Sequence, residues 1–216
     1  DHAISADAYI LGGESSGESN VTILNNYFVG GPSTPKTKTT PFSRGNGNFN
    51  LYQSGNYFDN NQNGILDGQR IEANEIWYPG IAAENFKTID VYTAYPSVRP
   101  KLSAKDAYTY LINNVGAILP QRDQVDAFLV TELQSKGTLG FYTYRESDLP
   151  LENGGLGYYE SADIPLDSDG DGIPDEWEEK LKLDKNNRAD ALQLSTQQLF
   201  KGYLNLEAYL ILLAQK

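Results

Sequence analysis

The chain has 216 residues, of which 39% are hydrophobic and 12% aromatic, so it has apolar surface for one sizeable core or two small ones. It contains no cysteine, which excludes a disulfide scaffold, a thiolate metal site and a cysteine nucleophile; its single histidine excludes a multi-histidine zinc or iron site. The formal net charge of −12 argues against nucleic-acid binding, and no apolar run is long enough to predict a membrane span.

The charges are distributed unevenly along the chain. No Asp or Glu occurs between Glu18 and Asp59, and this window carries the cations Lys36, Lys38 and Arg44. Carboxylates instead crowd into the C-terminal part of the sequence. The chain opens with DHAI and no initiator Met, which indicates a processed or truncated product.

Two segments near the N-terminus repeat one another at an offset of 30 residues. Residues 20–28 (NVTILNNYF) and 50–58 (NLYQSGNYF) share Asn, Asn, Tyr and Phe at equivalent positions, and turn residues follow each. Strands that repeat with no helix between them, and with Asn positioned to form a ladder, predict stacked coils of a parallel β-helix. Two unrelated antiparallel strands are the alternative. Because two coils are too few for a stable solenoid, we expect further coils from elsewhere.

Helical patterns replace the strand pattern after residue 100. Apolar residues recur at helical spacing in 103–118, which opens with a capping-box-like SAKD, and again in 123–136. Residues 138–166 are expected to form an extended linker, and shorter helices are expected at 175–181 and 204–214. In the second helix the residues expected to be buried are Val125, Phe128, Leu129 and Leu133.

The strongest motif is DSDGDGIPDEWE at residues 167–178. It has carboxylates at positions 1, 3, 5, 9 and 12 and glycine at position 6, which is the pattern of an EF-hand calcium loop. A solvated acidic linker is the alternative, but it does not account for the glycine or for the apolar residues in the loop. No helical pattern enters the loop, which favours a static, structural site. The predicted calcium ligands are Asp167, Asp169, Asp171, the carbonyl of Ile173, Asp175 and Glu178.

Two weaker acidic segments are also present. Residues 184–187 (DKNN), together with Asp190 and Glu207, are a candidate for a degenerate second calcium loop. Residues 59–67 (DNNQNGILD) copy several loop positions but have Arg70 at position 12, so we expect a turn between strands.

Taken in order, several segments resemble the secreted bacterial pectate lyases of polysaccharide lyase family one. The similar segments are NNYFVGGPST (25–34), GNYF (55–58), RDQVD (122–126), DSDGDGIPDEWE (167–178), LD (183–184) and GYLNLEAYL (202–210). Ile173 stands where the family usually has Met. The resemblance covers nearly the whole chain but only the C-terminal half of the family.

The resemblance implies a mainly β fold with three parts: C-terminal coils of a right-handed parallel β-helix at 1–100, a helical extension and linker at 101–160, and an EF-hand-like, calcium-binding helical tail at 161–216. It also implies calcium-dependent β-elimination of an anionic polyuronide. Such a protein would be secreted, periplasmic or at the surface of a bacterium. Lys36, Lys38 and Arg44 would then line a groove for acidic polysaccharide, the alternative being an ordinary solvated loop.

Two functions remain open at this point. The family's catalytic motif lies upstream of the matched region, so no catalytic residue is assigned here, and an N-terminal polypeptide of the same parent protein is the expected partner. The chain is then the C-terminal part of a lyase. Alternatively, it is a non-catalytic, calcium-stabilised carbohydrate-binding or surface module, which the missing motif favours for the chain taken alone.

Overall fold

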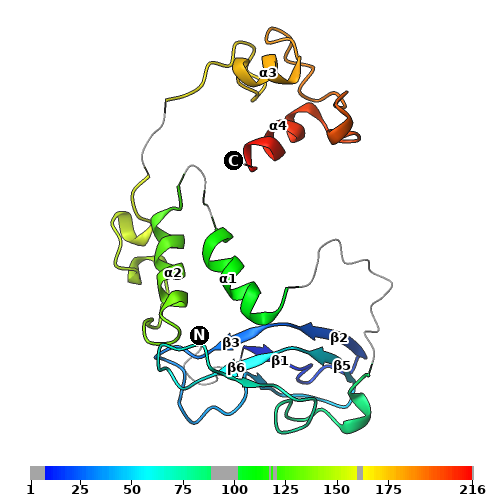
Figure 1. Cartoon of the computed structure of the whole chain (residues 1–216), viewed down its shortest axis with the longest axis vertical. Coiled ribbons are helices and arrows are strands. Elements are labelled where there is room, and N and C mark those ends of the chain that lie inside the picture. The colour runs from blue at the N-terminus through cyan, green and yellow to red at the C-terminus, as the bar shows by residue number, and fades with distance from the viewer. Residues whose placement is uncertain (1–7, 89–101, 117, 119–120, 160–162, 216) are drawn as a thin grey trace. The chain divides into compact units, whose positions relative to one another are not determined.

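The computed structural model describes residues 8–88, 102–116, 118, 121–159 and 163–215 (Figure 1). The chain divides into two compact units, Asp1–Ile118 with Arg122–Tyr158, and Leu119–Gln121 with Tyr159–Lys216. Within the described ranges, no helix has the length and apolar character that a bilayer crossing requires. The strands are β1 (Tyr9–Ile10), β2 (Ser19–Leu24), β3 (Tyr27–Val29), β4 (Phe42–Ser43), β5 (Phe49–Ser54), β6 (Tyr57–Asp59) and β7 (Gln69–Arg70). The α-helices are α1 (Ala104–Asn114), α2 (Gln124–Gln134), α3 (Asp175–Leu181) and α4 (Asn205–Leu213).

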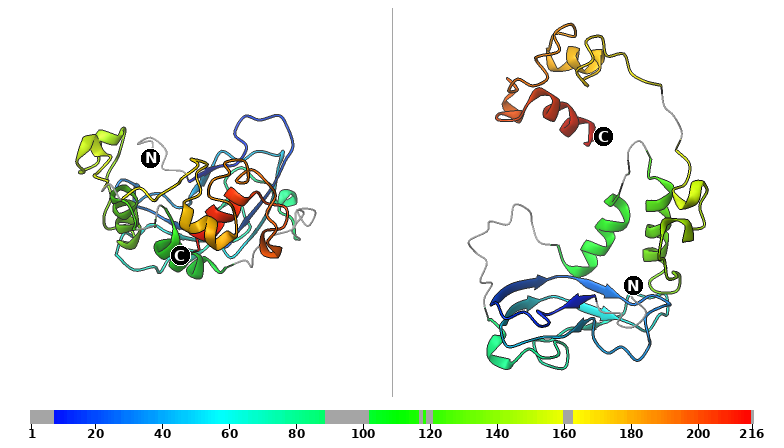
Figure 2. Two further views of the ribbon diagram at one scale, coloured as in Figure 1. Left: turned by 90° about the horizontal axis from the view of Figure 1, so that it is seen from above. Right: turned by 180° about the vertical axis from the view of Figure 1, so that it is seen from behind.

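The first unit is built on two passes of the chain that pair in parallel. β1 pairs with β4, β2 with β5 and β3 with β6, so each strand lies beside its counterpart in the next pass (Figures 1 and 2). The register places Asn20 opposite Asn50 and Tyr27 opposite Tyr57. The sequence repeat is therefore confirmed as parallel pairing, and the antiparallel alternative is wrong. β7 adds to β6 in the antiparallel direction.

A third pass begins where the sequence shows no repeat. Phe86 forms a parallel bridge with Leu51, and the backbone N–H of Lys87 donates to the carbonyl of Leu51 at 2.8 Å. The preceding turn of 3₁₀ helix, Ala83–Asn85, brings Asn85 beside Asn50. The sequence signal fails here because this pass follows a longer, irregular connection and shares few residue types with the first two.

All three small sheets contribute to one apolar core. Phe42 stacks on Tyr78 with ring centroids 4.5 Å apart, and Phe28 meets Phe42 edge-on at 5.1 Å. Because successive strand residues face opposite sides, Phe49 and Leu51 are buried while Asn50 between them is not. The buried core residues are Leu11, Ile23, Phe42, Phe49, Leu51, Phe58, Ile71, Tyr78 and Ile81.

Asparagine side chains connect the passes, as the repeat predicts. The side chain of Asn50 donates to that of Asn20 at 3.1 Å, and Asn85 donates to Asn50 at 3.1 Å, which makes a ladder over three passes. Asn56 is fully buried: its Oδ1 accepts from the backbone N–H of Asn26 at 2.9 Å. Its Nδ2 donates to the carbonyl of Ile23 at 2.8 Å. Asn56 therefore satisfies backbone groups that turn away from the strand ladder.

Helices α1 and α2 follow their sequence signals closely. Ser103 caps α1 by accepting from the N–H of Asp106 at 3.1 Å, and Asp123 caps α2 by accepting from Asp126 at 2.8 Å. α1 contacts both β3 and α2. One expectation is wrong: Leu129 is 50% exposed, and Val130 is the residue of α2 that is buried. The expected linker also contains two short 3₁₀ helices, Glu146–Asp148 and Asn153–Gly155.

The second unit packs α3 and α4 around a small apolar centre. The rings of Trp177 and Tyr209 meet edge-on at 5.3 Å. α3 ends at Leu181, and the C-cap residue Lys182 that follows has a positive φ of 61°. The segment before α4 folds back so that Leu194 bridges Leu204. The buried apolar residues of this unit are Ile173, Leu181, Ala191, Phe200 and Ala208.

The role of Asn56 can be tested by substitution. Asn56→Ala removes the partners of a partly buried N–H and a buried carbonyl, and we expect it to lower the free energy of unfolding by about 2 kcal/mol. The matched control is Asn20→Ala at the exposed end of the ladder, for which we expect a loss below about 0.5 kcal/mol. Denaturant unfolding of both variants measures the difference. Equal losses would contradict a special role for Asn56.

Candidate metal centre

The acidic loop at residues 167–178 is curled by hydrogen bonds from its own backbone. Asp167 accepts from the N–H of Gly170 at 2.8 Å through Oδ1 and from that of Gly172 at 3.0 Å through Oδ2. Asp171 Oδ1 accepts from the N–H of Ile173 at 2.7 Å. Gly172 has a φ of 97°, a conformation that strains other residues, which explains the glycine at this position. The side chain of Ile173 is fully buried and anchors the loop to the unit's core.

Carboxylates converge in two groups that share one residue. Ligand oxygens of Asp167, Asp169 and Asp171 lie within 4.8 Å of one another, and so do those of Asp171, Glu178 and Asp190. The structure thus brings together four of the carboxylates predicted from the loop. It adds Asp190, which the sequence had suggested for a separate second loop.

Several of these carboxylate oxygens are buried without a hydrogen-bond donor. Glu178 is 0% exposed and Asp190 is 7% exposed. A buried carboxylate with no donor is costly, and several facing one another add mutual repulsion. A cation between them removes both costs. The unpartnered atoms are Asp169 Oδ2, Asp171 Oδ2, Glu178 Oε1 and Oε2, and Asp190 Oδ1.

The protonation equilibria reflect the same crowding. Burial is the main cause that raises the pKa of Glu178 to about 7, and the charges of Asp169, Asp171 and Asp190 raise it further. Burial likewise raises the pKa of Asp171 above its ordinary value. A bound cation reverses this effect because it favours the charged form of each carboxylate. The atoms of this cluster that could bind a metal are all oxygens, which fits a hard divalent cation such as Ca²⁺ or Mg²⁺.

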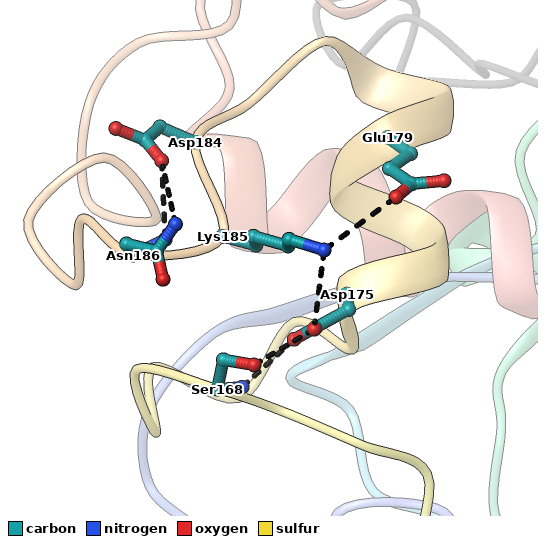
Figure 3. Close-up of polar contacts among 6 residues, drawn as sticks. All are labelled: Ser168, Asp175, Glu179, Asp184, Lys185 and Asn186. Carbon is teal, nitrogen blue, oxygen red and sulfur yellow. Dashed lines mark hydrogen bonds and ion pairs between the residues drawn. The ribbon is translucent and has the colours of Figure 1, made fainter.

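Asp175 lies outside both acidic groups. Its carboxylate accepts from the N–H and the hydroxyl of Ser168, each at 2.8 Å, and lies 3.9 Å from the ammonium of Lys185 (Figure 3). The Ser168 hydroxyl is the main cause that lowers the pKa of Asp175. Lys185 also lies 3.8 Å from Glu179 on α3. Asp175, the first residue of α3, is therefore hydrogen-bonded to Ser168 near the start of the loop and does not face the other carboxylates.

The segment after α3 does not form a separate acidic cluster among the described residues. Asp184 points away from Lys185 in Figure 3, and its Oδ1 accepts from the N–H of Asn186 at 3.2 Å. Glu207 accepts from the N–H of Leu204 at 2.7 Å and so caps α4. Of the residues considered for a second loop, Asp190 alone joins an acidic group in the described part of the chain.

The loop at residues 59–67 provides a useful contrast. Asp59 is only 2% exposed, but its Oδ1 accepts from the N–H of Asn61 at 3.4 Å and its Oδ2 from that of Asp67 at 3.1 Å. The carboxylate of Asp67 accepts from the side chains of Asn61 and Asn63, which lowers its pKa. The segment connects β6 to β7, so the expected turn between strands is confirmed.

Two of the three cations from the basic window line a groove of about 410 Å³ in the first unit. Lys36 and Lys38 lie on its wall together with Trp77, whose ring meets Phe58 edge-on at 6.4 Å. Arg44 is not among the lining residues. The groove also contains Asp59 and Asp67, so the lysine charges are balanced there.

Substitution of Glu178 should raise the melting temperature in chelator and lower it in the presence of a divalent cation. In chelator, Glu178→Gln removes one of the repelling charges and supplies amide donors to its neighbours, so we expect the melting temperature to rise by a few degrees. With a saturating divalent cation we expect it to fall below that of the unsubstituted chain, because a ligand is lost. Calorimetry in both buffers measures the change. A shift of the same sign in both would argue against a cation site.

Comparison with known proteins finds relatives along nearly the whole chain. The probable pectate lyase C of Aspergillus flavus is 39% identical over 204 residues, which are 93% of this chain and 43% of that protein. The same values hold for the probable pectate lyase C of Aspergillus oryzae. That of Neosartorya fischeri is 37% identical over 199 residues, covering 92% of this chain and 43% of the relative.

The chain therefore spans less than half the length of the curated relatives it matches. No protein-family profile and no solved structure matches it. These relatives are fungal, so the likeness gives no support to the bacterial origin indicated by the sequence motifs. Over more than nine-tenths of its length, the chain is similar to fungal proteins named probable pectate lyase C.

Proposed function

We propose that the chain is the C-terminal part of a secreted, calcium-dependent pectate lyase that cleaves an anionic polyuronide by β-elimination. The observation that carries this proposal is the 39% identity over 204 residues to a probable pectate lyase C. Because the match covers 43% of that relative, the catalytic residues are assigned to an N-terminal polypeptide of the same parent protein. No residue of this chain is given a catalytic role.

The fold proposed for residues 1–100 is a set of C-terminal coils of a right-handed parallel β-helix. Its support is the parallel pairing of β2 with β5 and of β3 with β6 at a constant offset, together with the Asn ladder. In this proposal residues 101–160 are a helical extension and linker, and residues 161–216 are a calcium-binding tail. Each coil needs neighbours to bury its faces, which is why we infer further coils before this chain.

The cofactor proposed for the tail is Ca²⁺. The proposed ligands are Asp167, Asp169, Asp171, the carbonyl of Ile173 and Glu178. Asp175 belongs to the same loop, and its carboxylate accepts hydrogen bonds from Ser168 that hold the loop in its curled shape. The site is structural: it holds the helical tail together, and any calcium that takes part in catalysis lies on other coils. An extracellular module of this kind binds calcium at about 10⁻⁴–10⁻³ M, which fits a secreted protein.

The proposed substrate contact is the groove that contains Lys36 and Lys38. Two ammonium groups beside the half-buried ring of Trp77 suit an acidic sugar, whose carboxylate pairs with a cation and whose ring face packs on an aromatic residue. Asp59 and Asp67 limit the net positive charge, so we expect modest affinity. Arg44 was expected to contribute, but the proposal now rests on the two lysines.

The rival function is a non-catalytic, calcium-stabilised module that binds carbohydrate or a surface. The observation in its favour is that the groove lies wholly within this chain, whereas the catalytic motif does not. Where the module binds carbohydrate, both functions have an acidic polysaccharide as partner. The difference is whether the intact protein breaks it.

An assay of the intact native protein separates the two functions. The protein carrying this chain is purified from its source, its mass is measured, and it is incubated with polygalacturonate in calcium and in chelator. We expect a larger polypeptide and calcium-dependent ultraviolet absorbance from an unsaturated uronate product. Binding without product by the complete polypeptide would sink the lyase proposal and leave the module.

The groove is tested on the 216-residue chain itself. We expect Lys36→Ala combined with Lys38→Ala to weaken binding of oligogalacturonate about tenfold, with an effect that shrinks at high salt. Arg44→Ala is the matched control, since it removes a cation of the same window outside the groove. Calorimetric titration measures both. Equal weakening by the control would show a general charge effect instead of a groove.

A further inference from the structure

Asp190 reaches the acidic cluster from outside the twelve-residue loop. It lies twelve residues beyond Glu178 in the sequence, after α3 has ended, yet its carboxylate lies within 4.8 Å of ligand oxygens of both Asp171 and Glu178. An EF-hand loop alone does not require such a residue. Its position is therefore an independent feature of this fold.

Asp190 makes several hydrogen bonds, of which one orients its side chain and one ties it to α4. Its Oδ2 accepts from the backbone N–H of Asp184 at 2.9 Å. Its backbone carbonyl accepts from the buried side chain of Asn205, the first residue of α4, at 2.8 Å. One carboxylate oxygen is thus used to orient the side chain, and the backbone is tied to α4.

The other oxygen of Asp190 is left without a donor. Oδ1 is buried and unpartnered, and it belongs to the same group as the fully buried, unpartnered Glu178. A hydrogen-bonding role alone would use Oδ2 and would leave Oδ1 buried at a cost. Asp59 shows that a buried carboxylate elsewhere in this chain has donors for both of its oxygens.

We propose that Asp190 is a direct ligand of the calcium ion, so that the ion joins the 167–178 loop to the segment that leads into α4. This inference rests on the proposed calcium site. Asp190 supplies an oxygen on the side of the cluster occupied by Glu178. Asp175 instead holds the loop in shape through its hydrogen bonds to Ser168. Calcium then stabilises the second unit as a whole, since two parts of it that are separate in sequence meet at one ion, and the second part is tied to α4 through Asn205.

The test compares three variants of the 216-residue chain by calorimetric titration with calcium alone. Asp190→Asn keeps the size of the side chain and its acceptor for Asp184 but removes the charge. Asp184→Asn is the matched control, because it removes a charge from the same segment and lies outside both acidic groups. Glu178→Gln reports whether the loop binds calcium at all.

We expect Asp190→Asn to weaken calcium binding by about tenfold or more, and Asp184→Asn to leave it within about twofold. If Asp190→Asn stays within about twofold while Glu178→Gln weakens binding, Asp190 is not a ligand and the loop site stands. If Glu178→Gln also has no effect, the calcium site itself is wrong.

Melting temperature supplies a second readout that a purely structural role would not reproduce. In chelator, Asp190→Asn should be at least as stable as the unsubstituted chain, because it removes a repelling charge. In calcium it should gain less from the ion. Equal destabilisation in both buffers, including failure to fold in chelator where the unsubstituted chain folds, would overturn the proposal in favour of a hydrogen-bonding role.

Discussion

A polar atom that folding removes from water must find another partner, and two side chains in this chain meet that constraint in opposite ways. Asn56 is fully buried and surrounded by backbone groups of the neighbouring pass, so both ends of its amide are satisfied. Glu178 is equally buried, but neither oxygen has a donor, and other carboxylates face it. The amide of Asn56 is therefore satisfied by protein groups alone, whereas the oxygens of Glu178 are the atoms that the proposed cation would contact.

In the first unit the asparagines make the stacking specific. A slip of one residue between β2 and β5 would turn the apolar side chains outward and separate Asn20 from Asn50. The same register aligns Tyr27 with Tyr57, whose rings stack at 5.4 Å. The passes thus stack in one register, and Lys36 and Lys38 of the groove lie on a loop between them, where binding residues are common.

The cation that we propose for the second unit would supply stabilisation that a larger apolar core supplies in other proteins. The unit buries few large apolar side chains, and small units of this kind are commonly stabilised by metals. Hydrogen bonds and an ion pair join Asp175 to Ser168 and Lys185 and shape the loop. The remaining carboxylates therefore face one another before any cation binds. Such preorganisation lowers the entropic cost of the cation binding that we propose.

The sequence by itself determined the features that depend on local spacing. The repeat predicted parallel pairing with its Asn ladder, the capping residues predicted where α1 and α2 begin, and the 167–178 pattern predicted a curled acidic loop followed by a helix. Each of these is encoded by residues a few positions apart, or by a constant period.

Tertiary structure decided which distant residues meet. It turned Asp175 toward Ser168 and brought Asp190 to Glu178. It left Arg44 out of the groove that Lys36 and Lys38 line, and it started a third pass at Phe86. It also buried Val130 in place of Leu129. No spacing rule reports these outcomes, because they depend on how chain segments fold back and on which oxygen atoms find donors once water is excluded.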